Sequence, residues 1–293
     1  CDTAQTEEAI YSIVKPLSYL PVSRRGAKAQ VTCSGSGVEI KPGDLITGGG
    51  LKWTPSRTYY IDGDTSVEIY QGQWVEQFVD SYDTRMNHQK FPIGSDFVDT
   101  TTLEVWVNET GAGGSDSYGK LWKRVEDYEG NITGLTSGSP VYFLTTSTDG
   151  RYSFYFGDGF VGKKPTDMSQ IWIKYYETSG AEGNDTVTFI SGIPAVSVTG
   201  TEIAGVGGAY KEDIESVRNN APLWFQTQGR YVTAQDHRVG LLQERSGIVA
   251  NVWGGEDNDP PNYGRVYVSA LGNEGGSLTD ETRNDIVSVM KNK

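Results

Sequence analysis

The sequence predicts an α+β protein that is mostly β, in which a β-rich module is followed by a smaller α+β module. Apolar residues alternate with polar ones through most of residues 27–190, which is the period of a half-buried strand. The 293 residues include 37 Gly and 17 Tyr, a combination typical of turns and strands. Helical spacing appears after Gly208, which indicates a change of architecture.

The length suggests more than one domain, because about 150 residues per domain is common. We predict three segments. These are an N-terminal helix and linker at 1–26, a β-rich domain at 27–195 and an α+β domain at 206–293.

The first element is predicted to be a short amphipathic helix. Its apolar stripe has the spacing i, i+3, i+4, i+7 and consists of Ile10, Ile13, Val14 and Leu17. Pro16 lies inside this stripe and predicts a kink or an end there.

The β-rich domain is predicted from short runs with a period of two. These runs lie at 29–33, 38–40, 67–69, 103–107, 152–156 and 171–175. Gly, Asp and Pro indicate turns between them at 41–44, 62–64, 149–150 and 158–159.

The C-terminal module is predicted to combine helices with two strands. Ile214 and Val217 mark a first helical piece, and Asn219–Pro222 is interpreted as a turn before a second piece. Thr233 is expected to cap the next helix, with Asp236 three residues on. Strands follow at 248–252 and 266–268, and a last helix begins at a 277–279 cap and buries Ile286, Val289 and Met290.

Charge and composition exclude several classes of partner. The formal net charge is −13, which opposes binding to the phosphate backbone of nucleic acid. The chain has no run of 18 apolar residues, so we expect no membrane contact by this fragment.

Cys1 and Cys33 are interpreted as reduced thiols rather than a disulfide framework. Because the chain begins with Cys1 and closes on Lys293, we interpret it as a fragment that lacks both termini.

The motifs of common active sites are missing from the sequence. No phosphate-binding loop of the type G-x-x-x-x-G-K-[ST] occurs, and no G-x-S-x-G motif. His88 and His237 lie on different modules, without the spacing of a zinc site. We therefore predict no enzyme activity, no catalytic residue, no cofactor and no metal site.

Two alternatives to an assembly role follow from the residues. The 38 acidic residues and the aromatic strands allow a carbohydrate-binding or carbohydrate-cleaving protein with a groove of carboxylates. The segment Asp257–Asp259 resembles part of a calcium loop, but Pro260 and Pro261 interrupt the required order. A calcium-stabilised extracellular module is the third hypothesis.

Candidate interface residues come from the second module. Trp224 is interpreted either as core or as an interface anchor, because Trp is common in both. The same choice applies to Trp253 and Tyr263, which flank an acidic Gly-Gly…Pro-Pro loop containing Asp257 and Asp259. We expect this loop to contact a neighbouring subunit, because it is long, acidic and stiffened by proline.

Three segments together carry a resemblance to a known family. They run from Tyr155 to Asn184, from Gly207 to Asp236 and from Val252 to Val266, the last containing Trp-Gly-Gly-Glu-Asp-Asn-Asp-Pro-Pro-Asn-Tyr-Gly-Arg. In this order they resemble the baseplate wedge proteins of contractile-tail bacteriophages, within the baseplate J-like family. The resemblance covers roughly residues 5–293, and its second and third segments are the most specific.

The resemblance implies a structural role in a virion. Such subunits form the wedges of the tail baseplate, and copies of them join wedge to wedge in a ring around the central hub that changes shape when the sheath contracts. It implies assembly in the host cytoplasm, homodimer contacts and other wedge subunits as partners. The family pattern contains no catalytic residues.

Overall fold

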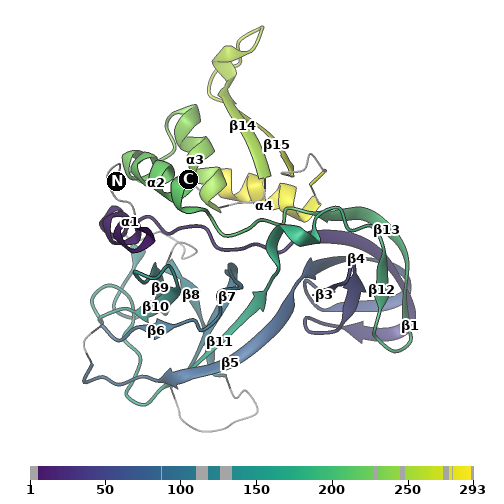
Figure 1. The fold of residues 1–293 in the computed structure, drawn as a ribbon, viewed down its shortest axis with the longest axis horizontal. Coiled ribbons are helices and arrows are strands. Elements are labelled where there is room, and N and C mark those ends of the chain that lie inside the picture. The colour runs from purple at the N-terminus through teal and green to yellow at the C-terminus, as the bar shows by residue number, and fades with distance from the viewer. Residues whose placement is uncertain are drawn as a thin grey trace. The chain divides into compact units, whose positions relative to one another are not determined.

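The structure of the protein, a computed structural model, describes residues 6–86, 88–109, 118–125, 134–227, 230–244, 248–272, 277–278 and 280–291. This part is mostly β and contains four α-helices (Figure 1), which confirms the predicted fold class. None of its helices is both long enough and apolar enough to cross a membrane.

The chain divides into two compact units, each made from two separate stretches. Unit 1 consists of Cys1–Pro16 and Trp74–Tyr176, and unit 2 of Leu17–Gln73 and Glu177–Lys293. The predicted division at 1–26, 27–195 and 206–293 stays a proposal about folding units, because compact packing does not by itself test independent folding.

Unit 1 begins with helix α1 (Glu7–Val14), which continues as the 3-10 helix η1 (Lys15–Leu17). The α-helix therefore ends just before Pro16, as predicted. Its buried residues are Ile10, Tyr11 and Val14, whereas Ile13 is 42% exposed. The predicted stripe was wrong at Ile13, because Tyr11 takes the buried position beside Ile10.

The rest of unit 1 is a seven-stranded sheet packed on aromatic side chains. In spatial order its strands are β5 (Gln73–Ser81), β11 (Gln170–Glu177), β7 (Val98–Asn108), β8 (Lys120–Arg124), β9 (Val141–Thr146), β10 (Tyr152–Phe156) and β6 (Phe91–Pro92). Phe156 lies at the centre of the aromatic core, with ring centroids 4.9 Å from Trp122 and 5.5 Å from Phe91. The predicted alternation at 103–107, 152–156 and 171–175 is confirmed, since the apolar members are buried.

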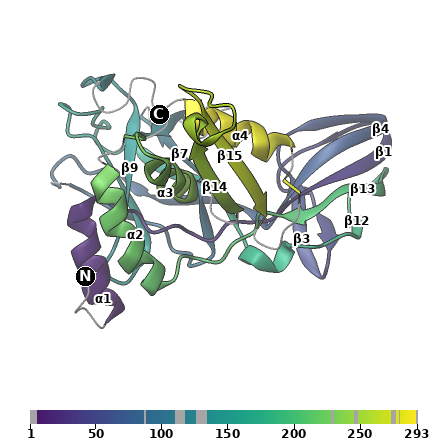
Figure 2. The same ribbon diagram turned by 90° about the horizontal axis from the view of Figure 1, so that it is seen from above.

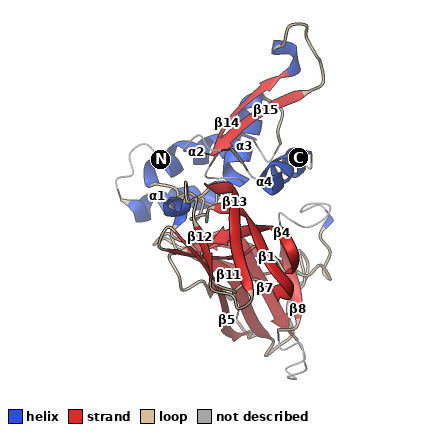
Figure 3. Cartoon of the chain, turned by 90° about the vertical axis from the view of Figure 1, so that its right-hand side faces the viewer, coloured by secondary structure: helices blue, strands red, loops and turns tan. Residues whose placement is uncertain are grey.

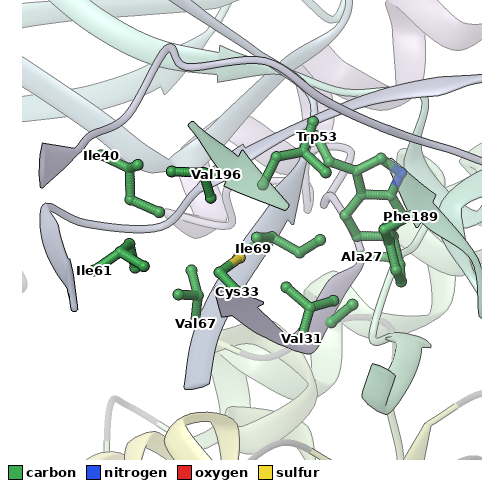
Figure 4. Packing of buried hydrophobic residues seen from close by; sticks show 12 residues of the cluster. Ala27, Val31, Cys33, Ile40, Trp53, Ile61, Val67, Ile69, Phe189 and Val196 are labelled. Carbon is green, nitrogen blue, oxygen red and sulfur yellow. The ribbon is translucent and has the colours of Figure 1, made fainter. Parts of the chain in front are cut away.

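Unit 2 contains a six-stranded sheet that encloses its own core. Its spatial order is β12 (Phe189–Ser191), β2 (Ile46–Gly48), β3 (Leu51–Pro55), β4 (Tyr59–Gln71), β1 (Lys28–Ile40) and β13 (Val196–Val206), and η4 (Gly180–Gly183) precedes β12. Figure 4 shows the core, where the Trp53 ring meets Phe189 edge to face at 5.0 Å. Trp53 Nε1 donates to the carbonyl of Gly48 at 3.1 Å, which satisfies its buried N–H.

Two long strands replace shorter predicted ones in this sheet. The runs at 29–33 and 38–40 belong to the single strand β1, which has an irregularity between Ser36 and Val38 where Gly37 has φ +67°. The turn predicted at 62–64 is wrong, because β4 continues through it and Gly63 pairs with Gly35 of β1. The turn at 41–44 is confirmed by the hydrogen bond from Asp44 N to Lys41 O, 3.0 Å.

The C-terminal part of unit 2 contains α2 (Ile214–Thr227), α3 (Ala234–Glu244), β14 (Ile248–Gly254), η5 (Gly255–Asp257), β15 (Val266–Gly272) and α4 (Asp280–Lys291). The turn predicted at Asn219–Pro222 is wrong, because α2 runs through it with Pro222 inside the helix. Val217 and Ala221, one turn apart, are both fully buried, and this packing offsets the hydrogen bond that Pro222 cannot make.

The start of α3 follows the prediction. Asp236 N donates to Thr233 Oγ1 at 3.2 Å, and Thr233 N donates to Asp236 Oδ2 at 2.8 Å, so the two side chains cap the helix reciprocally. Two residues of the prediction for α4 fall outside the described part of the chain: Thr279 of the cap, and Val289, whose side chain is not described. Ile286 is buried and Met290 is partly buried, as predicted.

Candidate functional site: the β14–β15 hairpin and its tip

Strands β14 and β15 form a hairpin whose base is held by the helices of the same unit. The antiparallel register runs from Ile248 opposite Gly272 to Gly254 opposite Val266. One face of the base packs into a small core with Leu241 of α3 and Ile286 of α4. In Figures 1 and 3 the hairpin extends well beyond these helices, so its far end lies clear of the core that anchors it.

The far end of the hairpin, residues 253–265, is called the tip below. An aromatic pair closes it: the rings of Trp253 and Tyr267 stack with centroids 5.8 Å apart and an angle of 13°. Trp253 Nε1 donates to Asn258 Oδ1 at 3.2 Å, and Asn262 Nδ2 donates to Tyr267 Oη at 2.9 Å. These bonds tie the loop to both strands, so the tip is an ordered surface rather than a free loop.

Gly255 fixes the path of the main chain through the tip. Its N–H donates to Arg265 O at 2.8 Å, and its carbonyl accepts from Asn262 N at 2.7 Å and from Asn258 N at 3.3 Å. A Cβ atom at this position would lie 1.8 Å from Asn262 O, which no side chain can tolerate without movement of the main chain. Gly255 therefore permits a close approach of two backbone segments that any larger residue would prevent.

The exposed side of the tip is aromatic and acidic. The Tyr263 side chain is 77% exposed, and Glu256, Asp257 and Asp259 are exposed as well. Arg265 is the one basic residue among the residues of the tip, so the tip carries a net negative charge. A surface of this kind is suited to a partner that offers an apolar recess for the ring and positive charge for the carboxylates.

A cavity of about 570 Å³ lies between β15 and α4 and is called the groove below. Its walls are Val266, Val268 and Ala270 of β15 and Ile286, Val287 and Met290 of α4, and His237 and Arg283 also line it. Val266 is 47% exposed and Val287 is 49% exposed, so two large apolar side chains are partly uncovered here. No pattern in the sequence predicts this groove, because its lining comes from three separate elements.

A second cavity, of about 500 Å³, lies between the segment near Tyr19 and the helices α2 and α3. Glu212 is largely buried at its wall, and its carboxylate accepts from Tyr19 Oη at 2.7 Å, from Asn220 Nδ2 at 2.8 Å and from Val22 N at 3.0 Å. Burial raises the pKa of Glu212, although these donors act in the opposite direction. The carboxylate thus joins the segment Tyr19–Val22 to α2, which is a structural task.

The structure places the candidate residues in two different elements. Trp253, Asp257, Asp259 and Tyr263 come together at the tip, whereas Trp224 lies on α2 and is partly buried. Tyr267, Asn258 and Asn262 complete the tip but were missed, although Tyr267 has the cross-strand position that the alternation of a hairpin assigns to it.

The carbohydrate-binding and calcium-binding hypotheses have less support from the structure. The aromatic residues Tyr152, Phe154 and Phe156 are buried, so they pack the core of unit 1 and form no sugar-binding face. In the part of the chain that the structure describes, no group of three or more His, Cys, Asp or Glu side chains is placed to hold a metal ion.

Comparison with known proteins bears on the same segment. Residues 233–292, which include α3, the hairpin and α4, match the family described as baseplate structural protein gp6, C-terminal domain I. The chain is also 29% identical to the baseplate wedge protein gp6 of Enterobacteria phage T4 over 181 residues, which cover 53% of this chain and 27% of that protein. The chain therefore spans much less than two thirds of the length of this relative.

These comparisons confirm the predicted resemblance to baseplate wedge proteins. They also confirm the prediction that the chain is not an enzyme, because the matching family is described as structural.

Proposed function

We propose that this chain, which is similar to the baseplate wedge protein gp6, is a structural subunit of a bacteriophage tail baseplate and that its hairpin tip contacts a neighbouring subunit. The observation that carries the proposal is the tip itself. It is an ordered, exposed surface with an aromatic ring and three carboxylates, and it lies inside the segment that matches the structural family.

The physical chemistry of the tip favours binding to a protein. Tyr and Trp side chains bury much area at a low cost in conformational entropy, and they are enriched at the centres of interfaces. The hydrogen bonds around Gly255 and Asn262 order the loop before any contact forms, so little entropy is lost on binding. The carboxylates around Tyr263 would favour a partner surface that carries positive charge.

The finer parts of the proposal concern assembly. We propose that copies of this subunit and other wedge proteins meet through surfaces of this kind, that they join wedges into a ring around the central hub, and that homodimer contacts take part. Symmetric self-association is the common arrangement for identical subunits. The subunit would take part in the rearrangement of the ring when the sheath contracts.

The experiment compares two variants of the tip with one control. Tyr263→Ala removes an exposed ring and is expected to leave the fold unchanged, whereas Trp253→Ala, Tyr263→Ala also removes the stacked indole. Tyr60→Ala is the matched control, because Tyr60 is 65% exposed on β4, outside the hairpin. The assays are sedimentation equilibrium over a wide range of concentration and co-assembly with the other wedge proteins, with circular dichroism to check the fold.

The proposal predicts that both tip variants weaken association at least tenfold and that Tyr60→Ala does not. If the double variant stays folded and assembles like the control with itself and with every other wedge protein, the tip is not an assembly surface.

A further inference from the structure

We propose that the groove between β15 and α4 receives the hairpin tip of a second copy of this chain, and that the two copies exchange their hairpins reciprocally about a twofold axis. This inference rests on the proposed function, because it names the partner and the receiving surface for the same tip. Two properties of the groove and one of the tip support it.

The first property is the apolar lining of the groove. Its walls are aliphatic on both sides, and Val266 and Val287 remain about half exposed within it. At about 570 Å³ it falls in the size range of pockets that hold a ligand or a large side chain. The tip offers a fitting group, because the ring of Tyr263 is 77% exposed and stands beside the ordered Gly-Gly…Pro-Pro loop.

The second property is the charge at the groove. Arg283 belongs to the lining, and its side chain is 59% exposed. Its ion pair with Asp280 is long, at 3.6 Å, and solvent-exposed, so it holds the guanidinium weakly. His237 of α3 also borders the groove. The groove thus presents the guanidinium of Arg283 beside an apolar recess, which complements a tip that carries an exposed tyrosine ring and three carboxylates.

The net charge of the chain makes this match selective. At −13, two copies repel each other over most of their surfaces. A contact between copies must therefore join an acidic surface to one of the basic side chains, and the tip and the groove form such a pair. An anionic membrane or a nucleic acid would instead be repelled by Glu256, Asp257 and Asp259.

The position of both surfaces on one hairpin suits a reciprocal exchange. Each strand has seven residues, which at about 3.3 Å per residue gives an arm of roughly 20 Å. The groove lies on the β15 side of this arm, where Figure 2 shows α4 alongside the hairpin, and the tip forms the end of the arm. If two arms lie antiparallel, each tip reaches the α4 side of the other copy, and the same contact forms twice. Such an isologous contact closes at a dimer.

The test is a charge-reversal cycle on the intact chain, measured by sedimentation equilibrium. Arg283→Glu reverses the groove, and Asp257→Lys, Asp259→Lys reverses the tip. Arg85→Glu is the control, because Arg85 is 86% exposed on unit 1 and its replacement makes the same change in net charge as Arg283→Glu. The proposal predicts that each reversal weakens self-association at least tenfold beyond the control, and that the combination of both restores it to within about threefold of the wild type.

Each other outcome overturns the inference in a recognisable way. If the tip reversal weakens self-association and Arg283→Glu behaves like Arg85→Glu, the tip contacts a different surface, and only the groove assignment fails. If the combined variant does not regain association, the two surfaces do not meet. If the wild-type chain is monomeric throughout, the partner is not a second copy, and co-assembly with other wedge proteins then tests the proposed function by itself.

Discussion

Replacing Gly255 with alanine should loosen the hairpin tip without unfolding the protein. The added Cβ would lie 1.8 Å from Asn262 O and 3.1 Å from Arg265 O, both main-chain atoms. The two backbone segments must therefore separate. This breaks the hydrogen bond from Gly255 N to Arg265 O and the one from Asn262 N to Gly255 O.

The size of the effect follows from these contacts. Each lost hydrogen bond costs about 1 kcal/mol, because the freed groups at an exposed tip regain water as a partner. Relief of the steric overlap adds about 1–3 kcal/mol. The closed state of the tip should thus lose about 3–5 kcal/mol. The core at the base of the hairpin, around Leu241 and Ile286, does not contain Gly255, so global unfolding should change less.

Native-state amide hydrogen exchange measures this loss directly. We expect exchange of the Asn262 amide to accelerate about a hundredfold or more, since about 1.4 kcal/mol corresponds to a factor of ten. Gly264→Ala is the matched control in the same loop. Gly264 has φ +74°, but a Cβ there meets no atom within 4 Å, so alanine carries only the cost of the left-handed conformation, about 1–2 kcal/mol.

Equal protection of the Asn262 amide in the Gly255→Ala and Gly264→Ala variants would refute this reasoning, because the two substitutions differ in the close approach of the backbone. Unchanged protection in both variants would show that the tip is not held closed by these hydrogen bonds in solution.

Three further predictions concern unit 2. Trp53→Ala should lower the free energy of unfolding by about 3–5 kcal/mol, because the ring is fully buried against Phe189, and a loss below 1 kcal/mol in urea unfolding would contradict this. Burial raises the pKa of Glu212 above its ordinary value of 4.5, so its contribution to stability is complete below that value and is lost as pH rises through the raised pKa. Glu212→Gln should therefore flatten the decline of the unfolding free energy over that window, and an unchanged slope would exclude Glu212 as its source. Burial raises the pKa of the Cys33 thiol to about 11. In a Cys1→Ser variant, where Cys33 is the remaining cysteine, a thiol reagent at pH 8 should therefore react slowly with the native protein and quickly with the protein unfolded in urea. Equally fast reaction in both states would contradict the burial of Cys33.

Most strands were predictable because each buries one face. The alternation of Val31 and Cys33 with polar neighbours in β1, for example, directly reports the pleat of a strand that covers a core. The continuation of β4 through Gly63 was not predictable in the same way. A glycine with φ +76° inside a strand has the local sequence of a turn, and only its pairing with Gly35 of β1 keeps the strand going.

Helix α2 was misjudged for a related reason. Pro222 is a strong local signal for the end of a helix, and the sequence offers no sign of the packing that overrides it. That packing comes from Val217 and Ala221, which are fully buried on one face of the helix. Tertiary contacts thus decided an element that local propensity alone assigned to a turn.

The candidate site shows the same division between local and distant information. Trp253, Asp257 and Tyr263 lie within eleven residues of one another, so a hairpin brings them together whatever the rest of the fold does. The groove depends on the packing of β15 against α4, and its lining comes from both elements and from α3. No spacing in the sequence indicates that β15 packs against α4, and the groove was therefore not predicted.

The tip and the groove also explain each other in physical terms. Two tips placed against one another would bring three carboxylates of one copy against three of the next, which opposes association. The exposed ring of Tyr263 by itself would favour a contact between two tips. The acidic residues of the tip oppose that contact, so the tip is expected to bind a surface of different charge. Arg283 gives the groove a positive charge, whereas the three carboxylates of the tip outnumber its single basic residue, Arg265. The aliphatic walls of the groove give the ring of Tyr263 a place from which water is excluded. An assembly built from identical chains with net charge −13 needs such unlike pairs, because like surfaces repel.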